Sequence, residues 1–174
     1  TEPQVSEEHR PAFRYGMKCF FEEGRSLAKL MHPNVVRVLN FFRANGTVYM
    51  VMQFERGRTL HDYIRKHRGE VKEMLIRAVF ARMLNGLREV HAHKLMHLDI
   101  KPSNLFVVQK HVKVADFGLA KDLEGFSAKV TSGMTPIYAA PETFNGMATR
   151  NSDQYSLAIV YQELLTGALP HPGP

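Results

Sequence analysis

Two short stretches of sequence decide the fold, and they stand on either side of a predicted β-hairpin. The stretch before the first strand is His97-Leu98-Asp99-Ile100-Lys101-Pro102-Ser103-Asn104, and the stretch after the second is Asp116-Phe117-Gly118. The strands are expected at residues 105–108 and 112–115. Because a two-stranded hairpin brings its outer ends together, Asn104 and Asp116 are expected to lie side by side.

The residue types at these ends suit a site for phosphate and a divalent cation. The amide oxygen of Asn104 and a carboxylate oxygen of Asp116 are hard ligands of the kind that Mg²⁺ prefers when it binds with phosphates. Asp99 and Lys101 add a carboxylate and an ammonium group on the same loop. These are the groups that phosphoryl transfer uses, because positioning and charge stabilisation supply most of its catalysis.

The segments around this hairpin alternate between helical and β patterns. Apolar residues recur every three or four positions over 13–30 and again over 71–91, which predicts two amphipathic helices. Between them, apolar runs at 35–42 and 48–54 flank Asn45-Gly46, a strong signal for a hairpin turn. This order of elements predicts an α+β fold.

Local signals set the bounds of the other segments. Residues 1–12 are polar and acidic and are expected to form a loop or a frayed end. The stretch Thr59-Leu60-His61-Asp62 has the pattern of a capping box that opens a short helix. The run 153–165 predicts a largely apolar, buried helix, with Gly167 as its C-cap.

Composition limits the class of protein. Of the 174 residues, 44% are hydrophobic and 23% are charged, which excludes collagen-like, low-complexity and wholly disordered chains. No apolar run reaches the ~18 residues of a membrane helix, and no signal peptide is visible. The single cysteine, Cys19, cannot form a disulfide within the chain. The expected location is the reducing cytoplasm, or the cytoplasmic face of a membrane if a longer parent protein carries an anchor.

The two stretches around the second hairpin resemble the catalytic loop and the metal-binding triplet of protein kinases. Ala140-Pro141-Glu142 follows in the right order and is similar to the family's Ala-Pro-Glu motif. Lys101 and Thr135 match the Ser/Thr class rather than the tyrosine class. The amino-acid sequence of residues 22–30 is most similar to that of bacterial eukaryotic-like (Hanks-type) Ser/Thr kinases. The resemblance therefore implies a protein that transfers the γ-phosphate of ATP to a Ser or Thr hydroxyl of a protein substrate.

The resemblance also implies a two-lobed fold with an incomplete N-lobe. Residues 1–12 would be a polar segment, residues 13–55 a partial N-lobe with helix C, strands 4 and 5 and the hinge, and residues 56–174 a mainly helical partial C-lobe. No glycine-rich phosphate-covering loop precedes residue 13. Lys18 is a candidate for the phosphate-binding lysine, but the helical periodicity through it favours a helix. The covering strands are therefore expected upstream of Thr1, and this piece is expected to have little or no activity by itself.

The same resemblance implies roles for the catalytic residues. Asp99 would orient the substrate hydroxyl and accept its proton, with Thr135 as a further catalytic residue, and Lys101 would neutralise the γ-phosphate. Asn104 and Asp116 would bind Mg²⁺, with Mn²⁺ as an alternative ion.

Further residues would bind the nucleotide or support the loop. Backbone groups of Gln53 and Glu55 would bind adenine, Met52 would be the gatekeeper, and Phe106 would lie beneath the ring. Glu23 would be the salt-bridging glutamate of helix C. Asp153 would anchor the catalytic loop.

One departure from the family pattern bears on regulation. Leu98 stands where most kinases have an arginine that pairs with an activation-loop phosphate, and leucine cannot form that pair. The sequence therefore predicts an activity that does not depend on phosphorylation of Ser127, Thr131 or Ser132.

Three alternative functions are a binding module, a zinc site and a nucleic-acid-binding protein. A kinase-like binding module without phosphotransfer is the main alternative. A zinc site at His91, His93 and His97 is disfavoured because no cysteine or acidic partner accompanies them. The 23 Lys and Arg against 17 Asp and Glu give a net charge of +6, but the cations are scattered and no nucleic-acid-binding motif accompanies them.

Overall fold

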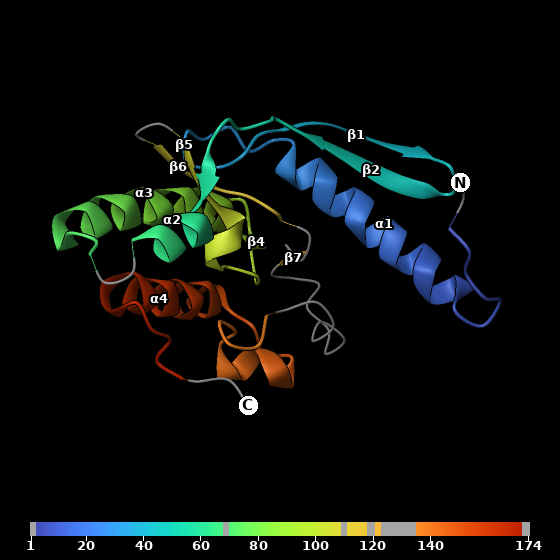
Figure 1. Cartoon of the computed structure of the whole chain (residues 1–174). Helices are drawn as coiled ribbons and strands as arrows, with labels where there is room; N and C mark the ends of the chain where they lie inside the picture. The colour runs from blue at the N-terminus through green and yellow to red at the C-terminus, as the bar shows by residue number, and fades with distance from the viewer. Residues whose placement is uncertain (1–2, 68–69, 109–110, 118–120, 123–134, 172–174) are drawn as a thin grey trace.

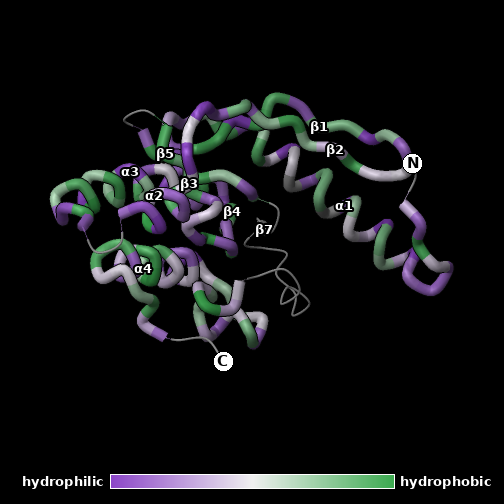
Figure 2. The backbone as a smooth tube through the Cα atoms, viewed as in Figure 1, coloured by the Kyte–Doolittle hydropathy of each residue, from purple (hydrophilic) through white to green (hydrophobic). Residues whose placement is uncertain are grey.

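The N-terminal part of the molecule is one helix packed beside a β-ribbon. The computed structural model describes residues 3–67, 70–108, 111–117, 121–122 and 135–171. Helix α1 (Arg10–Leu27) lies along strands β1 (Val38–Ala44) and β2 (Thr47–Met52) (Figure 1). In Figure 2, α1 changes repeatedly between hydrophilic and hydrophobic residues along its length, as its sequence period predicts.

The bounds of α1 correct the expectation for residues 1–12. The helix begins at Arg10, so residues 10–12 are helical and do not belong to a loop. Pro11 is tolerated there because the first turn of a helix does not use the backbone N–H that proline lacks. The helix ends at Leu27, three residues before the expected end.

The turn between β1 and β2 forms as the sequence predicts. Asn45 and Gly46 have φ angles of 50° and 68°, and two consecutive positive values are typical of the tight hairpin turns that match strand twist. The two strands are antiparallel, with an irregularity in register between Val38 and Asn40. Phe54 lies beyond the end of β2 and is 84% exposed, so the second strand is shorter than expected.

The C-terminal part combines small sheets with helices. Strands β3, β5 and β6 form one antiparallel sheet in the order β3-β5-β6, and β4 pairs with β7. The elements of this part are β3 (Arg58–Thr59), α2 (Leu60–Lys66), α3 (Glu73–Ala92), β4 (Leu95–Met96), the 3₁₀ turn η1 (Pro102–Asn104), β5 (Leu105–Val108), β6 (His111–Val114), β7 (Lys121–Asp122), the 3₁₀ turn η2 (Pro141–Asn145) and α4 (Arg150–Thr166).

Helix caps account for the start of α2 and both ends of α4. The predicted capping box is confirmed: Asp62 N–H donates to Thr59 Oγ1 at 3.1 Å, and Asp62 Oδ2 accepts from Thr59 N–H at 3.3 Å. A second capping box, from Thr149 to Ser152, starts α4 three residues before the expected position. Gly167 ends α4 with a φ of 72°, which confirms the predicted C-cap.

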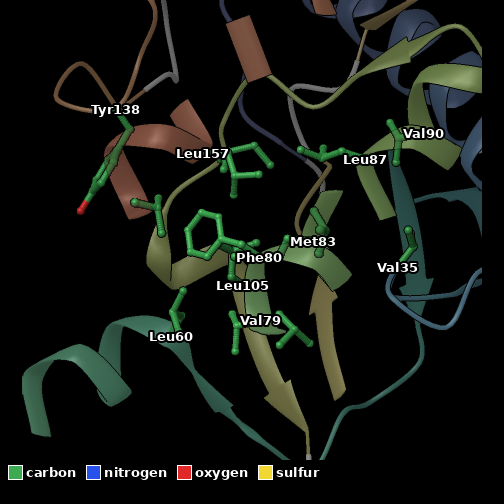
Figure 3. Close-up of a cluster of buried hydrophobic side chains, with 14 of the residues drawn as sticks. Val35, Leu60, Val79, Phe80, Met83, Leu87, Val90, Leu105, Tyr138 and Leu157 are labelled. Carbon is green, nitrogen blue, oxygen red and sulfur yellow. The ribbon is translucent and has the colours of Figure 1, made fainter. Parts of the chain in front are cut away.

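One hydrophobic core joins the two parts. Figure 3 shows side chains from α3, α4, β5 and the start of α2 packed together. The buried members of this core include Leu27, Val35, Leu60, Val79, Phe80, Met83, Leu87, Leu105 and Leu157. Among the described residues, no helix is long and apolar enough to cross a membrane.

Candidate active site

A buried carboxylate at the start of α4 holds the catalytic loop. Asp153 is fully buried and accepts hydrogen bonds from two consecutive backbone N–H groups of the loop, those of His97 at 2.9 Å and Leu98 at 2.8 Å. His91, on the last turn of α3, approaches Asp153 Oδ2 with Nε2 at 2.7 Å. The Asp153 side chain thus holds the loop in place, and its carboxylate is shared by two backbone N–H groups and the His91 ring.

The ring of His97 is oriented by two backbone partners. Its Nδ1 lies 3.3 Å from the N–H of Asp99 and accepts from it, and its Nε2 lies 2.9 Å from the carbonyl of Ala115. These contacts require the neutral tautomer that carries its proton on Nε2, because Nδ1 is an acceptor and the Ala115 oxygen needs a donor. The ring also packs against Phe117, with centroids 4.7 Å apart.

Four polar side chains contact one another at the catalytic loop that Asp153 and His97 hold in place. Lys101 Nζ lies 2.7 Å from Asp99 Oδ2 and donates to Thr135 Oγ1 at 2.9 Å, while the Thr135 hydroxyl donates to Asp99 Oδ1 at 3.0 Å. Asn104 Nδ2 donates to the carbonyl of Asp99 at 2.9 Å and to its Oδ2 at 3.0 Å. The structure therefore brings together Asp99, Lys101, Asn104 and Thr135, four residues that the sequence analysis singled out.

The β5–β6 hairpin brings its ends together as expected. The carbonyl of Asn104 accepts from the N–H of Ala115 at 2.9 Å, so the backbone of Asn104 lies next to the residue that precedes Asp116. Among the residues that the structure describes, both contacts of the Asn104 side-chain amide use Nδ2, so none of them occupies its oxygen. Asp116 is exposed. An amide oxygen and an exposed carboxylate suit Mg²⁺ held jointly with phosphates.

In the predicted adenine-binding segment, two backbone groups have no hydrogen bond to another described residue. The N–H of Gln53 donates to the carbonyl of Arg37 at 2.8 Å, and the carbonyl of Glu55 accepts from the N–H of Gly57 at 3.0 Å. The Gln53 carbonyl and the Glu55 N–H have no such bond within the described residues. Met52 is 41% exposed at the end of β2, and the half-buried Phe106 lies on β5 opposite Thr59.

Comparisons with known proteins decide the family. The protein kinase domain matches residues 4–174, which is nearly the whole chain. The chain belongs to the protein kinase family. It is 35% identical over 158 residues to a probable serine/threonine-protein kinase PknB of Lactococcus lactis subsp. lactis (strain IL1403), a match that covers 88% of this chain and 25% of that relative. The chain thus spans about a quarter of that relative's length.

Several predicted kinase residues fall outside what the structure describes. The side chain of Glu23 is not described, although its backbone lies on α1. Gly118 and the three activation-segment positions Ser127, Thr131 and Ser132 are outside the described residues. Lys18 lies on α1, five residues before Glu23, which confirms that this segment is helical.

The histidines considered for zinc have separate partners. His91 contacts Asp153, His97 contacts the Ala115 carbonyl, and His93 lies 3.0 Å from the carbonyl of Glu89. Among the described residues, no group of three or more His, Cys, Asp or Glu side chains is placed to hold a metal ion.

The sequence analysis missed two polar contacts around the kinase site. The Glu142 carboxylate of the Ala-Pro-Glu motif accepts from the Ser152 hydroxyl at 2.6 Å. The side chain of Glu55, considered only for its backbone, forms an ion pair with Lys113. Periodicity within one segment cannot indicate these pairs, because each joins residues ten or more positions apart.

A tyrosine next to the site is held neutral. The hydroxyl of Tyr138, three residues after Thr135, donates to Glu163 Oε2 on α4 at 2.8 Å. Burial raises the pKa of Tyr138 far above its usual range, and the neighbouring Glu163 carboxylate raises it further. The contact ties the segment around Thr135 to α4, the same helix that anchors the catalytic loop.

Proposed function

We propose that this chain carries the catalytic core of an ATP- and Mg²⁺-dependent protein Ser/Thr kinase. The observation that carries the proposal is the cluster of Asp99, Lys101 and Thr135. Asp99 accepts an aliphatic hydroxyl at 3.0 Å while an ammonium group lies 2.7 Å from its other oxygen. A carboxylate presented to a hydroxyl beside a fixed cation is suited to phosphoryl transfer, in which positioning and charge stabilisation dominate.

In the proposed reaction, Asp99 orients a Ser or Thr hydroxyl of a protein substrate and accepts its proton. The hydroxyl oxygen forms a bond to the γ-phosphorus, and the bond from that phosphorus to the β–γ bridging oxygen breaks, with its electron pair leaving on ADP. Lys101 neutralises charge on the transferred group. Asn104 and Asp116 would hold Mg²⁺, or Mn²⁺ in its place, which when bound offsets the charge of the phosphates.

The adenine of ATP would bind at these two backbone groups of the hinge. The carbonyl of Gln53 can accept from the exocyclic amine, and the N–H of Glu55 can donate to a ring nitrogen. Phe106 would then supply an apolar surface beneath the ring, with Met52 at the inner end of the segment.

The test compares wild type with Asp99→Asn in two measurements. The first is the shift in thermal midpoint on adding ATP with and without Mg²⁺; the second is transfer of radiolabelled γ-phosphate to a protein substrate. We expect both proteins to be stabilised by Mg²⁺-ATP, and the variant to lose phosphotransfer by about 10³-fold, within the range for loss of a general base.

The results of these measurements separate an enzyme from a kinase-like binding module. Stabilisation by Mg²⁺-ATP without any transfer that depends on Asp99 would favour a kinase-like binding module over an enzyme. We expect weak transfer from the 174-residue chain, because no glycine-rich phosphate-covering loop precedes residue 13. The cytoplasm, or the cytoplasmic face of a membrane, is the location that suits an ATP-dependent activity.

A further inference from the structure

A basic hollow opens on the surface formed by β3 and α2. Its volume is about 480 Å³, and it is lined by Arg58 from β3 and by Asp62, Arg65 and Lys66 from α2. All four residues are exposed. Three cations therefore face one carboxylate, which gives the hollow an excess of positive charge.

The single carboxylate is already engaged. Asp62 Oδ2 accepts from the Thr59 hydroxyl at 2.7 Å and from the Thr59 N–H at 3.3 Å, as the capping box requires. The hydrogen bond from the Thr59 hydroxyl lowers the pKa of Asp62, and the positive charge of Arg65 also lowers it. Asp62 therefore offers the three cations a nearby charge but no dedicated ion pair.

The cations of the hollow lack the acidic partners that some other basic residues have. Arg77 pairs with Glu73 at 2.7 Å, and Lys113 pairs with Glu55. Within the part of the chain that the structure describes, Arg58, Arg65 and Lys66 have no ion pair. A favourable interaction with the helix C-terminus explains two cations in the last turn of α2, but it does not explain Arg58, which comes from a strand.

The two elements that line the hollow contact β5 and the turn at the end of the catalytic loop. Arg58 pairs with Val107 on β5, one position from Phe106, and α2 packs against η1, the turn that ends at Asn104. An extended peptide covers ~3.3 Å per residue, so a few residues span the ~10 Å diameter of a helix. A substrate whose hydroxyl lies at Asp99 can thus present a neighbouring side chain to this surface.

We propose that the hollow binds Asp or Glu side chains that flank the phosphoacceptor of the protein substrate. The proposal rests on the kinase function proposed above and specifies its substrate class. Charge complementarity favours an acidic partner, because two unpaired positive charges remain after Asp62 is counted. None of the lining residues is aromatic, so the hollow lacks the stacking surface with which proteins bind single-stranded nucleic acid.

The first test measures binding, so that it does not depend on catalysis. Fluorescence anisotropy compares a labelled peptide that carries a Ser among Asp and Glu residues with a neutral counterpart that carries Asn and Gln. We expect the acidic peptide to bind more tightly to the wild-type chain. Arg58→Glu with Arg65→Glu should weaken it by about tenfold or more, since two exposed charge pairs of up to ~1 kcal/mol each are lost.

The matched control is Arg14→Glu with Arg88→Glu, two exposed arginines on α1 and α3 that change the net charge equally. We expect this control to stay within about twofold of wild type at physiological salt, where distant surface charges are screened. Equal binding of the two peptides, or an equal loss in both double variants, would overturn the proposal. Tighter binding of an oligonucleotide that also depends on Arg58 would overturn the assignment to a peptide.

The second test links the hollow to phosphotransfer in the longest active form of the kinase. The Arg58→Glu and Arg65→Glu variant should raise KM for the acidic peptide and leave kcat nearly unchanged, with no effect on the neutral peptide. Peptide binding that depends on Arg58 without this change in KM would contradict a substrate role. Complete absence of phosphotransfer would refute the proposed kinase function but would leave the binding result to be judged separately.

Discussion

Two residues at the active site, Leu98 and Asp116, hold left-handed backbone conformations. Their φ angles are 62° and 61°, which cost a non-glycine residue of the order of 1 kcal/mol. For Leu98 the surroundings offset this cost: its N–H is bonded to Asp153, and its side chain, 5% exposed, packs with Met96. The strained loop directs the next residue, Asp99, towards Lys101 and Thr135.

The apolar setting of Leu98 bears on regulation. Its side chain packs with Met96 and Ala148, which offer no charge to bind a phosphate. We therefore predict that replacing Ser127, Thr131 and Ser132 together by Ala lowers kcat by less than about twofold, because a lost phosphate would have had no arginine here to bind. Steady-state phosphotransfer assays measure kcat of the variant, and mass spectrometry confirms that its activation segment is unmodified. A large loss of kcat in the variant, together with the same loss when the wild-type protein is treated with phosphatase, would contradict the prediction.

The Thr135 hydroxyl should act by holding Asp99 and Lys101 in position. Thr135→Ala removes a hydrogen bond to each of them. We expect kcat to fall by about tenfold or more, as two positioning hydrogen bonds of about 1 kcal/mol each are lost, with little change in nucleotide binding. Thr135→Ser keeps the hydroxyl and should restore most of the rate. Equal losses in both variants would show that the methyl group, not the hydroxyl, is what matters.

At the scale of elements, the contact of α3 with the segment after α1 depends on a glycine. A Cβ at Gly86 would lie 2.7 Å from the carbonyl oxygen of Asn34, a backbone atom. The same carbonyl accepts from the N–H of Val114 at 2.9 Å, and the Asn34 amide donates to the carbonyl of Val112 at 2.8 Å. Gly86 thus lets α3 approach the point where the two parts of the molecule join.

We predict that Gly86→Ala lowers the free energy of unfolding by about 1–3 kcal/mol, the cost of an overpacked site, although alanine favours a helix. The matched control is Gly16→Ala on α1, where a Cβ meets no atom within 4 Å. That change should be neutral or stabilising by up to ~1 kcal/mol. Chemical denaturation of both variants gives the comparison, and a stabilised Gly86→Ala protein would refute the close approach.

Most elements could be predicted from the sequence because their signals are local. Asn45-Gly46 requires its own backbone conformation, the box from Thr59 to Asp62 bonds within one turn, and Gly167 ends its helix. Bounds were less accurate, as at Arg10, where Pro11 suits a first helical turn, and at Arg150, where a capping box starts the helix before its apolar run. Contacts such as Glu142 with Ser152 needed the tertiary structure.

At the scale of the whole molecule, the parts differ in how well they are covered. Helices α3 and α4 carry rows of fully buried residues, whereas most positions of β1 and β2 are partly or fully exposed. Phe42 and Tyr49, for example, stack on each other at 5.4 Å with about two fifths of each side chain exposed. A two-stranded ribbon of this kind has little stability of its own.

We therefore predict that backbone amides of β1 and β2 exchange with deuterium at least about 100-fold faster than buried amides of α3, because local opening of the ribbon exposes little apolar surface. Hydrogen exchange followed by mass spectrometry of peptides from 38–52 and 76–90 measures the difference. Similar protection in both segments would contradict the prediction and would mean that the ribbon is covered in solution.

The sequence by itself determined the family of this protein and the candidate residues for its proposed chemistry. Asp99, Lys101, Asn104 and Asp116 stand within eighteen residues around one hairpin, and local rules for hairpins bring the backbones of Asn104 and Ala115 together. Only the tertiary structure decided what holds these groups and what surrounds them. Asp153, Thr135 and the hollow at Arg58 depend on separate elements meeting in space, and no local pattern in a chain encodes such distances.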